Sequence, residues 1–309
     1  MWGDWKEVGR TVDGPASDLV ELEDSAGQHH TAIVFHEAFK GDSELGAGLD
    51  EVYRFLKDPR SDVVKGIVDR ERDLAALVYP TGNSVSIAEV TREFADLGER
   101  PGVRAAVELC YLVAQALYDL EARAARYELS NHGALTPWRI LLRKDGQPIL
   151  IGYGVPQVEL FAYLDDPRNR PPEDTLRYVP PERLRGEAED LSSDFLVLAL
   201  ICVELIVGRP VYDGLFEDIK QQASRGEGAY KLHKLKDSIP ETARQIFSRA
   251  LKPDLDTRYR EPLDFIHDLH DLLLSPAIQG PGLAQVAHRV LNAQIFPELR
   301  NDRLFIEFL

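Results

Sequence analysis

Residues 132–154 read HGALTPWRILLRKDGQPILIGYG and are the most informative stretch of the 309-residue chain. Two apolar runs, at 139–143 and 148–151, flank Asp145-Gly146, a pair of residues typical of a tight hairpin turn. A loop that begins at His132 precedes these runs, and Gly152-Tyr153-Gly154 follows them. The stretch therefore predicts two short antiparallel strands between two loops.

The pattern of the chain before this hairpin changes near residue 82. Short apolar and β-branched runs alternate with turns before that point, which indicates a small sheet. After that point, apolar residues recur at helical spacing. The predicted strands are 18–23, 31–36, 62–69 and 73–79, and the predicted helices are 49–56, one that opens at 86–90, and a long one at 103–127.

The rest of the chain reads as a long loop at 155–176 and as mainly helical after Asp190. The turn Pro80-Thr81-Gly82 is the candidate hinge. We expect an α+β chain with a small β-rich lobe at 1–82, a larger α-helical lobe at 83–274 and a C-terminal helical extension at 275–309. The extension docks either on its own domain or on a partner; we favour its own domain, because a free apolar end at 304–309 promotes aggregation.

In its spacing, this stretch resembles the catalytic centre of the protein kinase superfamily, the eukaryotic-like Ser/Thr kinases. That family has an H-R-D-L-x-x-x-N loop with a catalytic Asp and a metal-binding Asn, and a later D-F-G with a second metal-binding Asp. Ala134, Arg139 and Gly152 stand at those positions, five and then thirteen residues apart. The resemblance covers residues 5–272 and implies a bilobal kinase-like fold. Its framework residues in this stretch are His132, Leu135, Pro137, Tyr153 and Gly154.

A second block of the resemblance follows the long loop. Residues 175–182 read TLRYVPPE, which is similar to the end of a kinase activation segment. Asp194 stands where kinases begin a buried central helix. The resemblance also implies a buried ion pair between Glu182 and Arg258. Thr175 and Tyr178 are possible regulatory phosphorylation sites, although a packing role is the interpretation that we favour.

The N-terminal part of the resemblance depends on Ala32-Ile33-Val34, which we align with the kinase A-x-K. This alignment makes Ala32 a framework residue and places Val34 at the position of the phosphate-binding lysine. The glycine-rich loop before it keeps one of three glycines, Gly14. Glu51 is the candidate for the helix glutamate that pairs with that lysine in the family.

The chemistry of phosphoryl transfer is missing from these positions. Transfer depends on positioning and on neutralising phosphate charge. Val34 cannot neutralise phosphate, Arg139 and Gly152 cannot bind magnesium, and Ala134 cannot accept a proton. Thr136 is a further replaced position. We therefore expect a catalytically inactive pseudokinase that uses neither ATP nor magnesium as a cofactor.

Side chains are expected to fill the cleft that holds ATP in the family. We expect His132 to be a packing residue that stacks against Tyr153. The first residues expected in the cleft are Val34, Trp138, Arg139 and Tyr153.

Arg139 has two interpretations. It pairs with a nearby acid such as Glu51 or Asp145 and plugs the cleft, which is the interpretation that we favour. Alternatively, its fixed guanidinium binds an anion at the position of a metal.

Composition restricts the partners. The chain has 36 Lys and Arg against 52 Asp and Glu, and the net charge of −16 disfavours binding to nucleic acid and to anionic membranes. The apolar run 195–207 is too short to span a bilayer, and the first residues do not resemble a signal peptide. Cys110 and Cys202 lie in apolar helical runs without metal-ligand or redox spacing. We expect a cytoplasmic chain with buried, reduced cysteines and with protein partners.

The basic residues between 225 and 236 suggest a phosphate-binding patch, but a solvated helix or loop face is the interpretation that we favour. They are Arg225, Lys231, His233, Lys234 and Lys236.

The expected function is therefore binding, as a scaffold or allosteric regulator in a signalling or assembly complex. One alternative is an atypical ATP-binding phosphotransferase or nucleotidyltransferase that uses Arg139 in place of a metal. The other alternative is a purely structural subunit of a larger assembly.

Overall fold

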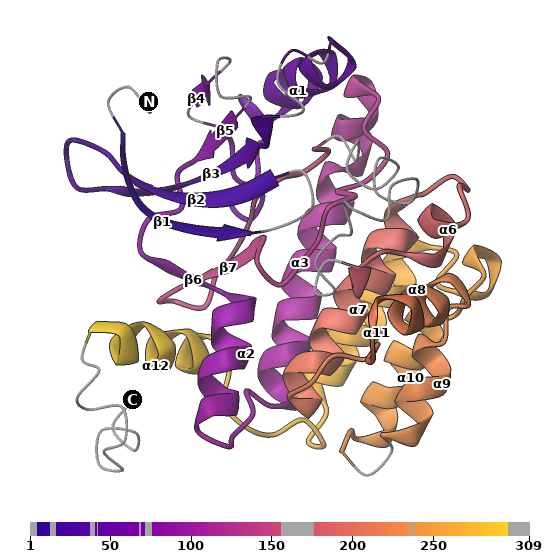
Figure 1. The fold of residues 1–309 in the computed structure, drawn as a ribbon. Helices are drawn as coiled ribbons and strands as arrows, with labels where there is room; N and C mark the ends of the chain where they lie inside the picture. Colours follow the sequence, from indigo (N-terminus) through magenta and orange to yellow (C-terminus); the bar gives the residue numbers. More distant parts are fainter. Residues whose placement is uncertain are drawn as a thin grey trace.

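The computed structural model describes residues 5–12, 17–37, 41, 43–67, 69–71, 76–155, 176–235 and 238–295. These residues form two lobes, a β-sheet with a helix beside it and a larger group of helices (Figure 1). The smaller lobe comes first in the chain. The predicted α+β, bilobal architecture is confirmed.

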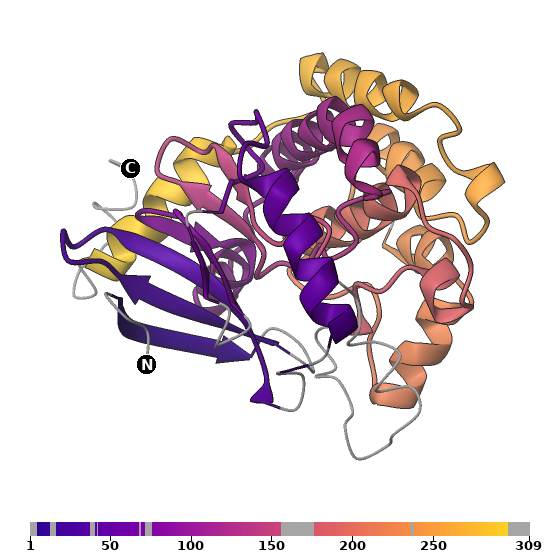
Figure 2. The same ribbon diagram turned by 90° about the horizontal axis from the view of Figure 1, so that it is seen from above.

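The smaller lobe is built on a five-stranded antiparallel sheet in the order β1-β2-β3-β5-β4. Helix α1 (Ser43–Leu56) lies beside this sheet (Figure 2) and buries Leu45, Leu49 and Val52 in the main core. These three residues are spaced at about one helical turn, which gives α1 one apolar face. The strands are β1 (Lys6–Val12), β2 (Ser17–Glu23), β3 (His29–Phe35), β4 (Asp69–Glu71) and β5 (Ala76–Tyr79).

The two faces of the sheet bury different side chains, because successive residues of a strand point to opposite faces. Leu19, Ile33 and Leu77 are cross-strand partners, and they belong to the same core as α1. The opposite face carries a separate apolar cluster, against which Trp5 packs. This cluster consists of Val20, Leu22, Ala32, Val34, Ala76 and Val78.

Residues 80–83 connect the lobes at the predicted hinge, and hydrogen bonds fix part of this connection to β3. Thr81 Oγ1 lies 3.0 Å from Thr31 Oγ1, and both side chains are buried. The amide of Gly82 donates to the carbonyl of His29 at 2.9 Å. The hinge is therefore bonded to the sheet rather than free of it.

The larger lobe begins with a second antiparallel sheet in the order β6-β7-β8. The predicted hairpin at 132–154 is confirmed as β7 (Ile140–Arg143) and β8 (Pro148–Leu150), which follow β6 (Ser84–Ser86). The smaller lobe reaches this sheet directly, because the amide of Lys65 donates to the carbonyl of Leu150 at 3.0 Å. The lobes are thus joined at a second place besides the hinge.

Helix α7 (Leu191–Val207) forms the centre of the larger lobe, and all of its residues except Ser192 are buried. An apolar helix of this kind must be surrounded by other elements, and α3 (Val103–Ala124) and α10 pack against it. Asp190 begins α7 by accepting a hydrogen bond from the amide of Ser192 at 2.8 Å. The remaining helices of this lobe are α2 (Ile87–Asp96), α6 (Pro181–Leu184), α8 (Phe216–Ser224), α9 (Gly228–Lys234), α10 (Glu241–Ala250) and α11 (Pro262–Leu274), with 3-10 turns at Ala125–Tyr127 and Leu255–Thr257.

The C-terminal extension places α12 (Leu283–Ile295) against its own domain, where it packs on α2, α3, β6 and β7. Arg289 bonds to Glu99 at 2.6 Å, and Glu108 accepts a hydrogen bond from the amide of Leu283 at 2.6 Å. Residues 283–295 therefore dock on their own domain, as we favoured; the apolar end at 304–309 lies outside the described residues. The buried side chains of α12 include Leu283, Val286, Ala287, Val290 and Leu291.

Some short elements differ from the prediction. The strand predicted at 62–69 is wrong, because only β4, at its end, joins the sheet. Residues 61–64 form a turn instead, in which Ser61 Oγ accepts hydrogen bonds from the amides of Val63 and Val64 at 3.2 and 3.0 Å. Strands β1 and β6 were not predicted. The predicted loop at 155–176 lies almost entirely outside the described residues.

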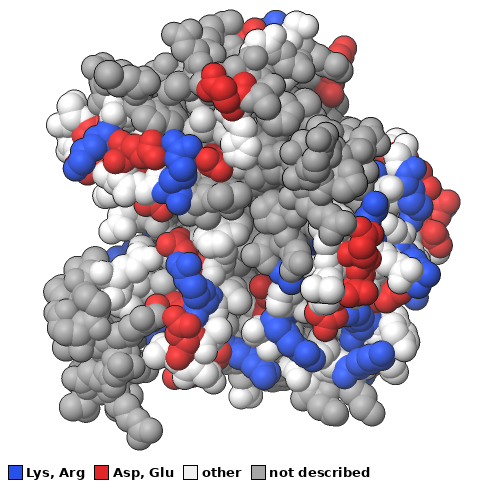
Figure 3. Space-filling view, in the orientation of Figure 1, with Lys and Arg blue, Asp and Glu red and all other residues white. Residues whose placement is uncertain are grey.

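The surface in Figure 3 carries interspersed positive and negative side chains rather than one field of a single sign. Cys110 and Cys202 are buried free thiols, as expected. Within the part of the chain that the structure describes, no helix is long and apolar enough to cross a membrane.

Candidate functional site

The two ends of the 132–154 stretch are held together beside the N-terminus of α7. Asp194, in the first turn of α7, accepts hydrogen bonds from the amides of His132 at 2.6 Å and Gly133 at 3.0 Å. The amide of Gly154 donates to the carbonyl of His132 at 2.9 Å. The loop before the hairpin and the turn after it therefore share one anchor.

Burial shifts the proton affinity of two groups at this anchor in opposite directions. It raises the pKa of Asp194 to about 7, against the effect of its amide donors. Burial, followed by the charge of Arg139, lowers the pKa of His132 to about 3. Nδ1 of His132 accepts a hydrogen bond from the amide of Ala134 at 3.3 Å, which requires this nitrogen to be unprotonated. His132 is therefore a neutral packing residue at pH 7.

An aromatic column connects this anchor to the smaller lobe. The rings of His132 and Tyr153 lie 5.3 Å apart with an interplanar angle of 61°, an edge-on contact, which confirms the predicted pair. Tyr153 in turn packs against Phe55 of α1, with ring centroids 5.1 Å apart. The turn after the hairpin thus fixes α1 relative to the larger lobe.

Gly152 lies at a contact between the two lobes. Its φ of +84° is a conformation that favours glycine. A Cβ at Gly152 would lie 2.9 Å from Cδ1 of Ile33 on β3 and 3.2 Å from Nη1 of Arg139. The backbone of Gly152 is therefore packed between a strand of the smaller lobe and the residue that precedes β7.

Arg139 is buried in this contact, with 3% of its surface exposed. Its Nη2 lies 3.4 Å from Oγ of Ser17, at the start of β2. The acids that we named as its partners are paired elsewhere: Glu51 lies 2.8 Å from Arg54, and Asp145 lies 3.5 Å from Arg143. Arg139 is thus buried between the lobes, as expected. Glu51 and Asp145, however, are paired with other arginines.

Tyr79, at the end of β5, completes the cluster. Its ring is fully buried, and among the described residues its hydroxyl has no hydrogen-bond partner. Burial raises the pKa of the phenol, and the positive charge of Arg139 acts in the opposite direction. We call Ser17, Ile33, Tyr79, Arg139 and Gly152 the cleft cluster.

The strand register corrects the alignment of β3. Val34 and Ala32 lie in the apolar cluster on the opposite face of the sheet, whereas Ile33 reaches Gly152. A shift of one residue moves every side chain of a strand to the other face. Ile33 rather than Val34 therefore faces the cleft, so the alignment of Val34 with the kinase lysine is wrong. Glu51 points to solvent, with 43% of its side chain exposed.

The remaining predicted positions lie in the loop before β7. Ala134, Thr136 and Pro137 are buried there, and Trp138 is half-buried against the main core. The carbonyl of Thr136 accepts a hydrogen bond from the amide of Arg139 at 3.1 Å. Ala134 presents only a methyl group, so this loop offers no side-chain base at that position.

The second predicted block is held by an ion pair deep in the larger lobe. Glu182 accepts two hydrogen bonds of 2.8 Å from Arg258, and both side chains are almost completely buried. Burial alone would raise the pKa of Glu182, but the bonds and charge of Arg258 overcome this effect and lower it. The hydroxyl of Ser193 on α7 also donates to Glu182. The predicted Glu182–Arg258 pair is confirmed.

Tyr178 is placed by packing, as we favoured. It is 9% exposed, and its hydroxyl bonds to Glu204 of α7. Thr175 lies outside the described residues.

Known proteins share this arrangement to different extents. No protein-family model matches the chain. A segment of 45 residues, 15% of the chain, is 38% identical to an Aurora kinase of Candida albicans, of whose length it covers only 8%. A mutant of the PknI kinase domain of Mycobacterium tuberculosis matches over 89% of this chain and 97% of that domain, with a TM-score of 0.63 and 16% sequence identity. This chain has the fold of a protein kinase domain.

Two further solved structures of the PknI kinase domain, a double mutant and the unsubstituted domain, give the same result. Their TM-scores are 0.59 and 0.58 at 15% identity, and each covers 88% of this chain and 96% of that domain. Identities this low establish the kinase fold and not an activity.

Within the kinase fold, sequence reasoning missed three residues of the cleft cluster and one of the aromatic column. Ile33 was displaced by one position, and the contact of Ser17 with Arg139 was not predicted. Tyr79 directly precedes the hinge proline, and Phe55 continues the apolar spacing of α1, so both had a weak signal. In the described ranges, no group of three or more His, Cys, Asp or Glu side chains is placed to hold a metal ion.

Proposed function

We propose that this chain is a pseudokinase, a kinase-fold protein that transfers no phosphate and acts by binding other proteins, as a scaffold or allosteric regulator. The observation that carries the proposal is the contact of Ile33 and Arg139 with the backbone of Gly152. In the family, the corresponding positions supply a lysine and two metal ligands to ATP.

The packing at Gly152 supports this proposal more strongly than the substitutions alone. The Cβ of any acid at this position would lie 2.9 Å from Cδ1 of Ile33, so an acid here would require the end of that side chain to move. Ala134 offers no group that could accept a proton from a substrate hydroxyl. Loss of one such element costs several kcal/mol of transition-state stabilisation, about 3 kcal/mol or more.

The alternative of a phosphotransferase or nucleotidyltransferase that uses Arg139 as its cation has less support. Arg139 is 3% exposed and lies beside Ser17, so a phosphate would first have to separate these groups. An anion site of the metal-replacing kind needs a guanidinium that the ligand can reach.

Thermal unfolding with and without Mg-ATP tests the proposal, because a ligand that binds only the native state raises Tm. We expect no change in Tm and no phosphate transfer to the chain itself or to a general protein substrate. A rise of several degrees that disappears in Arg139→Ala would support the alternative enzyme and overturn the proposal.

Isolation from the native host separates a regulator from a purely structural subunit. A regulator co-purifies with a partner whose activity changes when the chain is removed, whereas a structural subunit changes only the assembly of its complex. The cytoplasmic location stays a prediction, which the same isolation tests.

A further inference from the structure

A basic pocket between α9 and α10 is not explained by the cleft. It has a volume of about 340 Å³. His233 lines it from α9, and Arg244, Ser248 and Arg249 line it from α10, with Lys252 just beyond the C-terminus of α10. The sequence places these groups in two separate segments, and only the packing of α9 against α10 joins them.

Two cations of this pocket are available to a ligand. Arg244 is paired with Glu241, another residue of the lining. Arg249 and Lys252 are exposed, and neither has a carboxylate partner among the residues that the structure describes. In a chain with a net charge of −16, Arg249 and Lys252 thus give this pocket two cations that are not paired with carboxylates.

The basic run seen in the sequence does not provide this surface by itself. Lys231 is paired with Asp213, and Arg225 lies 3.8 Å from Glu227. Lys234 lies 4.4 Å from the centroid of the Tyr230 ring. The solvated-face interpretation therefore fits these three residues, and Lys236 lies outside the described residues.

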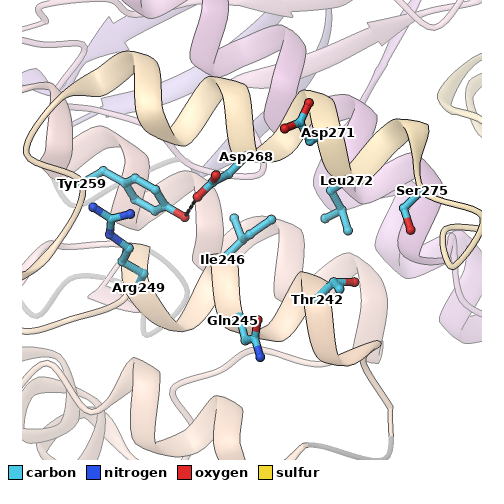
Figure 4. A pocket seen from close by; sticks show the side chains of 9 residues that line it. All are labelled: Thr242, Gln245, Ile246, Arg249, Tyr259, Asp268, Asp271, Leu272 and Ser275. Carbon is cyan, nitrogen blue, oxygen red and sulfur yellow. Dashed lines mark hydrogen bonds between the residues drawn. The ribbon is translucent and has the colours of Figure 1, made fainter.

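Arg249 is held in place from beneath. Its Cζ lies 4.1 Å from the centroid of the Tyr259 ring, and the hydroxyl of Tyr259 donates to Asp268 at 2.7 Å (Figure 4). Tyr259 is only 3% exposed, so the ring is a fixed surface under the guanidinium. Stacking uses the face of the guanidinium and leaves its N–H groups, which lie in the plane, for a ligand.

A second pocket adjoins this site at Arg249, and a hydrogen bond holds the backbone at Lys252. A second pocket of about 410 Å³ lies between α10 and α11, and Arg249 lines both pockets. Ile246 and Leu272 give this second pocket apolar surface, and Asp268 and Asp271 give it carboxylates (Figure 4). The carbonyl of Lys252 accepts a hydrogen bond from Nε of Arg258 at 2.7 Å, so the buried Glu182–Arg258 pair fixes the backbone of Lys252.

We propose that the pocket between α9 and α10 binds an oxyanion-bearing segment of a partner protein, through Arg249 and Lys252. The oxyanion is either a group of carboxylates or a phosphorylated side chain, since both accept charge-assisted hydrogen bonds from a guanidinium and an ammonium. This inference rests on the proposed function, because it names the chemistry of the partner. The overall charge of −16 makes nucleic acid a poor ligand for so small a basic area.

The test measures fluorescence anisotropy with the full chain and two labelled peptides of equal length. One peptide is rich in Asp and Glu, and the other has a single phosphoserine among neutral residues. We expect one of them to bind and added salt to weaken the complex. The double variant Arg249→Glu/Lys252→Glu should bind at least about tenfold more weakly, and the peptide that binds identifies the source of the oxyanion.

The matched control is Lys220→Glu/Arg225→Glu, which makes the same change of charge at a separate pocket along α8. Its affinity should stay within about twofold of the unsubstituted chain. Lys252→Glu alone changes one exposed side chain and keeps the inference testable if the first double variant does not fold. The inference is overturned if neither peptide binds, if both double variants lose affinity equally, or if a single-stranded RNA binds more tightly than both peptides.

Failure here is distinct from failure of the proposed function. A chain that binds neither peptide and does not respond to Mg-ATP overturns the pocket but leaves the pseudokinase proposal standing. If the chain transfers phosphate, the pseudokinase proposal is overturned. If its peptide binding is nevertheless lost in the Arg249 and Lys252 variants, the proposal for the pocket is still supported.

Discussion

The carboxylate of Glu182 and the guanidinium of Arg258 face each other through two parallel hydrogen bonds of 2.8 Å inside the larger lobe. Arg258 also donates to the carbonyl of Lys252, and Ser193 donates to Glu182. This pair therefore joins α6, α7 and the segment that follows α10. A buried pair with all of its hydrogen bonds made is sensitive to the loss of either partner.

Replacing Arg258 by alanine should destabilise the protein by about 3–5 kcal/mol, because the charge of Glu182 would remain buried without a partner. Urea unfolding measures this change. Arg60→Ala removes an exposed arginine 3.2 Å from Asp58 and should cost at most about 1 kcal/mol. A loss below about 1 kcal/mol for Arg258→Ala would contradict this account of the pair. The double variant Glu182→Leu/Arg258→Met should be more stable than the single variant, because no charge is left buried.

Gly152→Ala should destabilise the protein by more than the effect of its backbone conformation alone. Gly152 and Gly82 have φ of +84° and +60°, so alanine is strained at both positions by about 1–2 kcal/mol. Only at Gly152 would the new Cβ meet a neighbour, Ile33, at 2.9 Å, whereas nothing lies within 4 Å at Gly82. The difference between the two variants in thermal unfolding measures the contact between the lobes. Equal losses would show that the end of the Ile33 side chain makes room for the new Cβ without cost.

His132→Phe should remove part of the acid sensitivity of the fold. The folded ring has a pKa of about 3, well below the ordinary value of 6.5, so between these values only the unfolded chain binds the proton. Stability is therefore lost as the pH falls from 6.5 towards 3, by up to about 1.4 kcal/mol per pH unit. Urea unfolding over this range should give a flatter profile for the variant than for the unsubstituted chain. Parallel profiles would mean that the folded ring is protonated as easily as the unfolded one.

Asp194→Asn should change the pH profile in the opposite direction. The folded carboxyl has a pKa of about 7, above its ordinary value of 3.8, so between these values the folded chain holds a proton that the unfolded chain has lost. Its contribution to stability therefore decreases as the pH rises from 3.8 to 7, by up to about 1.4 kcal/mol per unit. The asparagine variant should lack this decrease. It should also be less stable overall, because an amide oxygen cannot replace both carboxylate oxygens that accept from His132 and Gly133.

Gly146→Ala should loosen α12 without unfolding the rest. The Cβ would lie 2.5 Å from the amide nitrogen of Ala284, at the start of α12. Hydrogen exchange should therefore become faster in residues 283–295 than in α7. Gly186→Ala is the matched control, since its φ of +70° is similar and no atom lies within 4 Å of the new Cβ. Unchanged exchange in α12 would show that the turn of the hairpin does not hold the helix.

Residue patterns along the chain were enough to predict the hairpin, and the resemblance to the kinase family implied the His132–Tyr153 contact and the Glu182–Arg258 pair. These features depend on framework residues that identify themselves by type and interval. The facing of β3 could not be predicted in the same way. Both faces of this strand are buried, so its sequence HHTAIVF has no alternation of polar and apolar residues to show which side chains point to the cleft.

The pocket between α9 and α10 was beyond sequence reasoning for a different reason. His233 lies on α9 and Lys252 follows α10, and only tertiary packing decides which charges remain unpaired. The same holds for Arg139, whose position next to Ser17 depends on a contact between residues 122 positions apart.

The bonds of the hinge limit how the lobes can move. Thr81 and Gly82 are bonded to β3, and Ser84 is already paired with Arg143 in the second sheet, which α12 covers. Asn83 is thus the single residue between the segment that is bonded to the sheet of the smaller lobe and the segment that is paired in the sheet of the larger lobe. The bond between Lys65 and Leu150 is a second attachment, so a rotation of one lobe against the other would have to strain it as well as the hinge.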